Sequence, residues 1–218
     1  MKITISDIIH AKLPALRIAT LTCDVQNSPT SDELWEILLQ ECVQIKTAFQ
    51  LEEINKRPAI AATRQAYKIL GKDPNRYRPS AEALCRRIIR DIPIYRLSTL
   101  VDIINIVSIR SGFSIGGFDA EKIDGNVELS VGSPDDVFEA IGRGILNVES
   151  LPLYRDNLGG IGTPTSDNER TKITEKTTKL LLIFNAYNGT EGLNQAVEQA
   201  VSLLEKFAEA KNISIKIL

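Results

Sequence analysis

Two arginines placed just ahead of a helix start form the first candidate anion site in the sequence. Arg76 and Arg78 lie in residues 71–84 (GKDPNRYRPSAEAL), where Gly71 can end one helix and Ser80 can cap the next. The positive end of a helix with cations beside it can hold a phosphate or a carboxylate. The same arginines could instead hold the loop by bonding to carbonyl groups and nearby acids. The sequence alone leaves both interpretations open.

The positive charge continues through the flanking segments. Residues 57–90 contain nine Lys or Arg and two acids, whereas residues 100–156 contain ten acids and four bases. The formal net charge of the chain is −2, so no overall charge attracts it to a polyanion. A local basic face is compatible with a single polyanion-binding site, and a solvated face on two helices is the simpler alternative.

Three further polar features could bind a ligand. Asn105 interrupts the apolar helical pattern LVDIINIVS, where a buried amide needs a partner. Residues 114–119 (SIGGFD) contain a glycine pair that allows either close approach of a ligand or a tight bulge. Residues 162–174 (GTPTSDNERTKIT) are rich in hydroxyl and charged groups, as in many functional loops and many exposed connections.

Several classes of chemistry lack their usual residues. The single histidine, His10, has no apparent nucleophile near it, and no metal-ligand spacing or phosphate-binding glycine loop is present. We therefore expect no cofactor and no metal. The cysteines at positions 23, 42 and 85 are far apart and lie in apolar stretches, which is typical of free thiols in a reducing compartment. The absence of a signal peptide and of a membrane-spanning run predicts a cytoplasmic protein with no membrane partner.

The hydrophobic pattern predicts which elements must position these residues. Strands are expected over residues 2–9, 16–25, 114–119, 122–132, 177–187 and 213–218. Helices are expected over residues 31–49 (capped by Ser31), 58–70, 80–90, 98–112 and 190–207 (capped by Thr190). Helices concentrated early and strands concentrated late predict an α+β fold within one domain spanning residues 1–218.

Four segments in the same order resemble a known family. RYRPSAEAL, STLVDIINIVSIRSG, SIGGFDAEKIDGNVELSVG and DNLGGIGTPTSDNERTKIT are similar to parts of the B3/B4 domain, the editing region of the phenylalanyl-tRNA synthetase beta subunit. The resemblance covers about residues 57–188, so the earlier strands and helix and the last helix would be additions. It implies a three-layer α+β domain with an unusual β-sandwich and flanking helices.

The resemblance also implies a site. In the synthetase, this domain admits the aminoacylated end of transfer RNA and hydrolyses wrongly attached tyrosine. The asparagine of the family maps to Asn105 and the aspartate of its turn maps to Asp119, but Gly116 replaces the histidine of that turn. This replacement removes a polar group and could enlarge the pocket. The acidic residue of the pocket would be Asp167 or Glu169. The expected pocket residues are Asn105, Gly116, Gly117, Asp119, Ser166 and Asp167.

Three functions are compatible with this resemblance. The first is a hydrolase that removes amino acids from mischarged transfer RNA in trans. The second is a non-catalytic module that binds transfer RNA, aminoacyl-tRNA or a free amino acid, which the missing histidine favours. The third is a structural protein with a vestigial pocket. The first two predict contacts of RNA with the basic residues Arg76, Arg78, Arg86 and Arg87.

Overall fold

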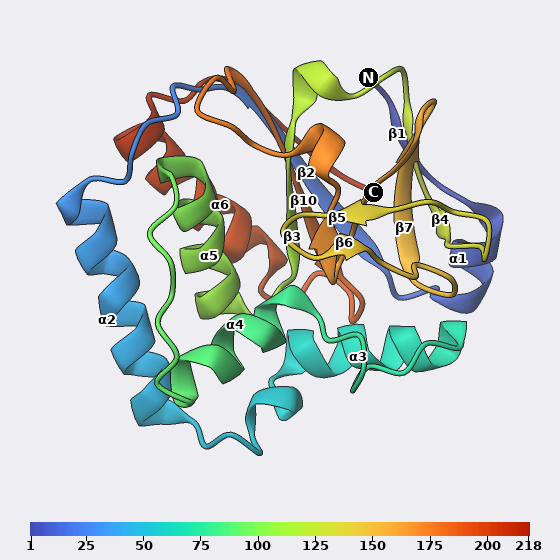
Figure 1. The fold of residues 1–218 in the computed structure, drawn as a ribbon, viewed down its shortest axis with the longest axis horizontal. Helices are drawn as coiled ribbons and strands as arrows, with labels where there is room; N and C mark the ends of the chain where they lie inside the picture. Colours follow the sequence, from blue (N-terminus) through green and yellow to red (C-terminus); the bar gives the residue numbers. More distant parts are fainter.

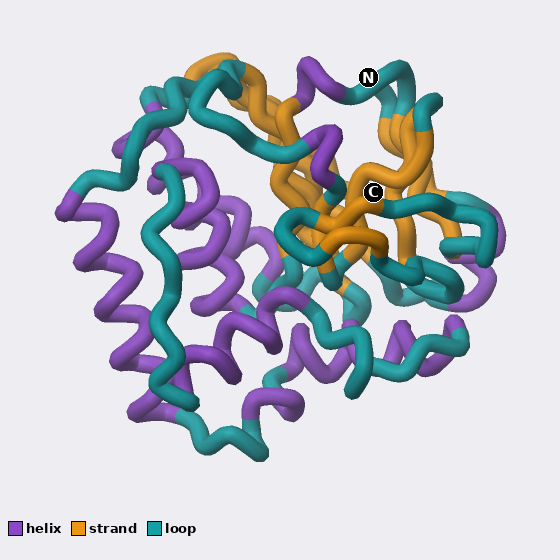
Figure 2. Tube along the Cα trace, viewed as in Figure 1, coloured by secondary structure: helices purple, strands orange, loops and turns teal.

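Two β-sheets pack face to face, and a group of helices covers the outer side of one of them (Figure 1). The computed structural model describes residues 1–218. Figure 2 shows the main helices gathered on one side and the strands on the other. The predicted three-layer α+β fold with a β-sandwich is therefore confirmed.

The middle layer is an antiparallel sheet of four strands in the order β11-β2-β10-β3. Side chains on its central strand β10 alternate between the two faces because successive residues of a strand point to opposite sides. Leu180, Leu182 and Phe184 pack with the helices, whereas Leu181 and Ile183 pack against the second sheet. The strands are β2 (Arg17–Asp24), β3 (Ile115–Asp119), β10 (Lys179–Ala186) and β11 (Lys211–Ile217).

The outer sheet has five short strands in the order β1-β4-β7-β8-β9. Its apolar side chains meet those of the middle sheet in one buried cluster that includes Leu129, Tyr154 and Ile161. A small hairpin of two further strands joins the end of this sheet. The strands are β1 (Ile3–Ile5), β4 (Val127–Val131), β7 (Pro152–Asp156), β8 (Gly159–Thr163), β9 (Ser166–Asp167), β5 (Glu139–Ala140) and β6 (Gly144–Ile145).

The helices α2, α5 and α6 form the third layer, whereas α3 and α4 lie along one end of the sheets (Figure 1). α5 contacts both α2 and α6, so it is the central helix of this layer. No helix is both long and apolar enough to cross a membrane. The helices are α1 (Asp7–Lys12), α2 (Asp32–Ala48), η1 (Ile54–Lys56), α3 (Pro58–Leu70), α4 (Ser80–Ile89), α5 (Thr99–Ser111), η2 (Ala120–Lys122), η3 (Glu169–Thr171) and α6 (Leu193–Ala208).

The N-terminal segment differs from its prediction. The strand expected over residues 2–9 ends at Ile5, and residues 7–12 form the short helix α1. Ile9 and Leu13 are buried together in the sandwich core, whereas Ile8 is exposed. A spacing of four residues between the buried side chains is helical, so packing against the core overrides the β-branched composition.

The predicted helix ends are confirmed in part. The Ser31 side chain accepts the Leu34 amide at 3.2 Å, and Gly71 and Gly112 end α3 and α5 in the left-handed conformation. The predicted caps at Ser80 and Thr190 are wrong. Ser80 is the first residue of α4, where Pro79 already supplies the extended backbone before the helix, and α6 begins only after Gly192.

Candidate functional site

A cleft of about 930 Å³ opens between α4, α5, the end of β3 and the β8–β9 turn. Residues 90–98, which we call the α4–α5 connection, form another part of its wall. The lining combines cations at the rim with hydroxyl, amide and carboxyl groups and an apolar surface. The residues that line it include Arg78, Arg86, Arg87, Arg90, Tyr95, Leu97, Ile104, Asn105, Ile115, Gly117, Arg143, Thr165, Ser166, Asp167, Lys172 and Ile173.

Four of the six predicted pocket residues line this cleft. They come from three separate elements: Asn105 from α5, Gly117 from β3, and Ser166 with Asp167 from β9. The Gly117 amide donates a 3.0 Å hydrogen bond to Oδ2 of Asp167, which joins the last two of these elements. Residues that lie far apart in the sequence therefore form one polar surface.

Gly117 allows α5 to lie close to β3. A Cβ atom at this position would lie only 2.4 Å from Cδ1 of Ile104 and 3.1 Å from Cδ1 of Ile173. Both isoleucines line the cleft, so a larger residue would push apolar side chains into the space beside Asn105. The glycine thus sets the shape of the cleft floor.

Asp167 is the acid in the cleft whose pKa is shifted. Although part of its surface remains accessible, burial of the carboxyl raises its pKa to about 7, and the hydrogen bond from the Gly117 amide opposes this shift only partly. No protein donor bonds Oδ1, which lies beside Gly116 and Gly162. A carboxyl that changes charge near neutral pH can act as a general base.

The β8–β9 turn is held tightly next to the start of α4. The Thr163 hydroxyl accepts the amides of Thr165 and Ser166 at 3.0 and 3.1 Å. The Tyr67 hydroxyl lies 2.9 Å from that of Thr165, and the Ser80 amide donates to the carbonyl of Pro164 at 2.8 Å. These bonds place Thr165 and Ser166 in the cleft wall.

The same bonds change the interpretation of the helix start as an anion site. The Ser80 amide is bonded to Pro164, and the Ala81 amide lies 3.4 Å from the Ser114 hydroxyl, so protein acceptors occupy both groups. The loop before α4 is held mainly by Arg64 and Lys72, which donate to the carbonyls of Pro74 and Glu149 at 3.1 and 2.6 Å. The residues that hold the loop are therefore not Arg76 and Arg78.

Three arginines at the rim are exposed and make no hydrogen bond or ion pair through their side chains: Arg78, Arg90 and Arg143. Arg143 lies in the β5–β6 turn, which reaches the cleft because the Ile141 amide bonds to the Asp167 carbonyl at 3.1 Å. Cations without protein partners can neutralise phosphates without first breaking internal contacts.

The other two predicted RNA-binding arginines of α4 also line the cleft, but the protein already engages them. Arg86 donates to the Leu51 carbonyl at 3.3 Å and lies 3.6 Å from the Glu82 carboxylate. Arg87 donates to the Pro93 carbonyl at 2.7 Å, and its guanidinium lies 4.8 Å from the centre of the Tyr95 ring. Both side chains still contribute positive charge to the rim.

The remaining predicted residues lie outside the cleft. A Cβ at Gly116 would meet the Phe118 ring at 2.7 Å, so the missing histidine side chain does not widen the cleft. Asp119 accepts bonds from the Thr177 hydroxyl and the Glu121 amide at 2.9 and 3.2 Å. Arg76 lies beside the Tyr77 ring, 5.7 Å from its centre. Glu169 pairs with Lys172 and also does not line the cleft.

Sequence reasoning missed several lining residues. A signal for Tyr95 is its place as the first aromatic residue after the basic stretch that ends at Arg90. Arg90 was part of the basic stretch but was not singled out. Arg143 gave no local signal, since only the pairing of its hairpin with β9 brings it to the cleft.

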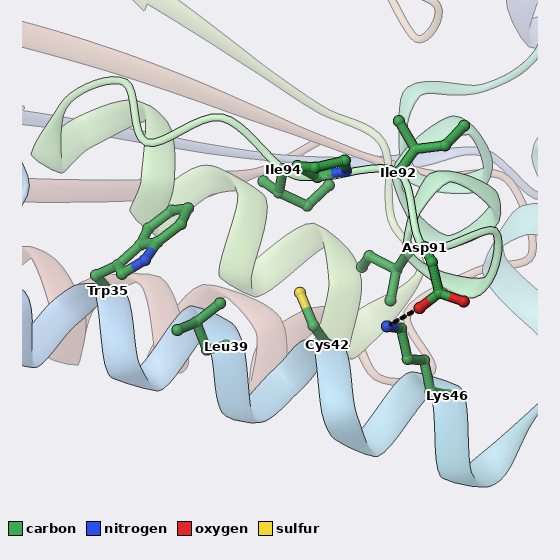
Figure 3. Close-up of a pocket in the computed structure, with 9 residues that line it drawn as sticks. Trp35, Leu39, Cys42, Lys46, Asp91, Ile92 and Ile94 are labelled. Atoms are coloured by element: carbon green, nitrogen blue, oxygen red, sulfur yellow. Dashed lines mark hydrogen bonds and ion pairs between the residues drawn. The ribbon is translucent and has the colours of Figure 1, made fainter.

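A second, smaller cavity of about 220 Å³ lies between α2 and the α4–α5 connection (Figure 3). Its lining is mostly apolar and includes Trp35, Leu39 and Ile94, and an ion pair between Lys46 and Asp91 lies beside it. Ile92 borders both this cavity and the cleft. The connection is thus the wall between the two cavities.

Nowhere in the structure do three or more His, Cys, Asp or Glu side chains gather as metal ligands.

Two comparisons relate the chain to known proteins. The chain is similar to the crystal structure of an N-terminal fragment of the phenylalanyl-tRNA synthetase beta subunit from Pyrococcus horikoshii, with 12% sequence identity and a TM-score of 0.49. The alignment covers 97% of this chain and 50% of the fragment, so the chain spans half the length of that fragment. No curated protein sequence matches the chain. The profile of the B3/4 domain matches residues 62–209, well over half of the chain, and the chain therefore belongs to the B3/4 domain family.

Proposed function

We propose that the protein binds the aminoacylated 3′ end of a transfer RNA in the cleft and hydrolyses the ester of a wrongly attached amino acid in trans. The observation that carries this proposal is the joining, in one cleft, of exposed arginines at the rim with a carboxyl of pKa about 7 on the floor. Membership of the B3/4 family and the resemblance to an editing region support it.

The rim would hold the sugar–phosphate backbone. Arg78, Arg90 and Arg143 lie around the same opening and have no protein partners to give up. Because phosphate contacts release bound counterions, the affinity for RNA should fall as the salt concentration rises. Arg86 and Arg87 would add to the local positive potential.

The residues on the cleft floor would carry out the hydrolysis of the aminoacyl ester. An aminoacyl ester is already activated, so positioning and activating a water molecule accounts for much of the catalysis required. Above pH 7 the Asp167 carboxylate can accept a proton from water while the water oxygen bonds to the ester carbonyl carbon. The bond between that carbon and the ribose oxygen then breaks, and the proton held by Asp167 passes to the departing ribose oxygen, which releases the amino acid and restores the carboxylate. The Asn105 amide would hydrogen-bond the aminoacyl group. The apolar lining from Ile104, Ile115 and Ile173 would contact the amino-acid side chain.

A non-catalytic binding module is the second candidate. One observation favours it: the cleft lining contains no histidine, the side chain used most often for general acid–base catalysis, and no cysteine. Such a module would use the same rim and floor for recognition. The open cleft, lined by polar as well as apolar groups, argues against a vestigial pocket filled by side chains.

Release of labelled amino acid from a panel of mischarged transfer RNAs, including tyrosyl-tRNA(Phe), tests these functions. We expect release by the wild type and a loss of 100-fold or more in Asp167→Asn. The matched control is Asp135→Asn, which removes an exposed carboxyl away from the cleft and should retain full activity. Binding without release would identify the non-catalytic module, and neither binding nor release would reject both functions.

A further inference from the structure

We propose that Tyr95 is a stacking platform for an unpaired base of the RNA strand that enters the cleft. This inference rests on the proposed function and adds a specific contact to it. Tyr95 lies in the α4–α5 connection and lines the cleft, yet 66% of its surface is exposed. Its neighbour Leu97 also lines the cleft and is 60% exposed. The rim therefore presents an apolar surface among its arginines.

The Tyr95 ring is held in place on one side. The Arg87 guanidinium lies 4.8 Å from the ring centre, and its Nε is fixed by the 2.7 Å bond to the Pro93 carbonyl. A guanidinium at this distance is attracted to the face of the ring. With one face supported in this way and most of the side chain exposed, the ring offers its other face to a ligand.

The connection that carries Tyr95 is anchored on both sides of it. Arg96 donates to the Thr30 carbonyl at 3.1 Å, and Ile94 packs against the main hydrophobic core and lines the small cavity (Figure 3). The backbone around Tyr95 is thus fixed before any ligand arrives. A pre-positioned ring loses little conformational entropy on binding.

The surrounding charge favours nucleic acid as the occupant. The free cations Arg78, Arg90 and Arg143 border the same opening and match a phosphate backbone. Proteins that bind single strands combine such cations with exposed aromatic rings on which the bases stack. Bases within a duplex are already stacked on both sides, so the platform would contact an unpaired end.

Fluorescence anisotropy with two labelled RNA hairpins, identical except for a single-stranded 3′ overhang, tests the inference. We expect Tyr95→Ala to weaken binding of the overhanging hairpin roughly 5- to 100-fold and to leave binding of the blunt hairpin unchanged. Tyr95→Phe should bind like the wild type because it keeps the ring. Tyr95→Leu should behave like Tyr95→Ala. Thermal unfolding of each variant verifies that this exposed position does not alter the fold.

The outcomes separate the inference from the proposed function. If the wild type binds the overhanging hairpin and Tyr95→Ala binds it equally well, the platform is rejected and RNA recognition stands. Equal weakening for both hairpins, or full binding by Tyr95→Leu, also rejects base stacking. If the wild type binds neither hairpin nor aminoacyl-tRNA, the proposed function fails, and a protein partner on the exposed Tyr95 and Leu97 would then be sought.

Discussion

Asp156 and Asp167 lie on the same outer sheet, the first buried and the second half-buried, but hydrogen-bond donors surround the carboxyl of Asp156 and not that of Asp167. Asp156 accepts four hydrogen bonds: two from the Arg170 guanidinium at 2.9 and 2.7 Å, and one each from the Asp124 and Leu158 amides at 2.9 Å. Asp167 accepts one, from the Gly117 amide.

The pKa values of the two carboxyls follow from this difference. Burial pushes the pKa of Asp156 upwards, but the bonds from Arg170 and the two amides outweigh it and hold the pKa below its usual value. Burial dominates at Asp167 and raises its pKa to about 7. A buried acid with a full set of donors stabilises a fold, whereas a poorly compensated acid in a cleft is a candidate for chemistry. The donors around Asp156 favour a structural role for this residue, and their scarcity around Asp167 supports the general-base role proposed for it above.

The largest expected effect is on hydrolysis. If Asp167 is the general base, kcat/KM for a mischarged transfer RNA should rise with pH through about 7, since only the ionised carboxylate accepts a proton. In Asp167→Asn the rate should be about 10²–10⁴-fold lower, without this inflection. A pH–rate profile measures both. Retention of the inflection in Asp167→Asn would show that another group is the base.

The next effect tests the structural role of Asp156. Arg170→Met should lower the free energy of unfolding by about 2–3 kcal/mol, because Asp156 keeps two amide donors but loses its countercharge, and the partial exposure of Arg170 moderates the loss. Because the folded-state pKa of Asp156 is depressed, this stabilisation is present above about pH 4 and disappears as the pH falls further. Urea unfolding at pH 7 and pH 3 measures it. An equal loss at both pH values would contradict the ion-pair explanation.

The helices and the central strands were largely predictable from sequence, because periodicity and end signals agree there. Leu180, Leu182 and Phe184 alternate cleanly, and Ser31 and Gly71 mark true helix ends. The sequence indicated no strands for β7, β8 and β9, since these are short and β8 consists largely of glycine, which has low strand propensity. Pairing with β4 stabilises β7, which in turn pairs with β8, and β8 pairs with β9; these contacts are not encoded locally.

The candidate site was predictable only in its parts. Asn105, Gly117 and Asp167 were singled out from separate segments, and the family resemblance suggested that they belong together. The sequence could not show which glycine of the pair faces the cleft. In the structure Gly117 faces the cleft and Gly116 faces Phe118, because adjacent residues of a strand point to opposite sides. The hydrogen-bond donors around Asp156 and Asp167 are also placed by tertiary contacts. The difference in the number of donors around the two carboxyls could therefore be seen only in the structure.

A third prediction concerns the cost of ionising Asp167. Because its folded-state pKa is above the ordinary value of 3.8, the folded protein loses stability as the pH rises from about 4 to 7. Asp167→Asn cannot ionise, so it should be more stable than the wild type at pH 8 by on the order of 2 kcal/mol, and the difference should shrink towards pH 4. Urea unfolding across this range measures the difference. A variant that is less stable at pH 8 would show that the carboxylate is well compensated.

The smallest expected effect concerns the charge of the Asp167 carboxylate. It tests whether the rim cations stabilise this charge in the way that Arg170 stabilises the charge of Asp156. Arg78, Arg90 and Arg143 are exposed and make no bond to the carboxyl, so replacing all three with Gln should move the midpoint of the pH–rate profile by less than about half a unit. The same variant should reduce the slope of log affinity for RNA against log salt by about two, since each lost phosphate contact on a single strand contributes about 0.7. Replacement of the exposed Lys12, Lys211 and Lys216, which do not line the cleft, is the charge-matched control and should change neither quantity. A large upward shift of the midpoint in the arginine variant would mean that the rim cations hold Asp167 ionised. Asp156 and Asp167 would then both be stabilised by arginines and would differ only in how far those arginines lie from the carboxyl.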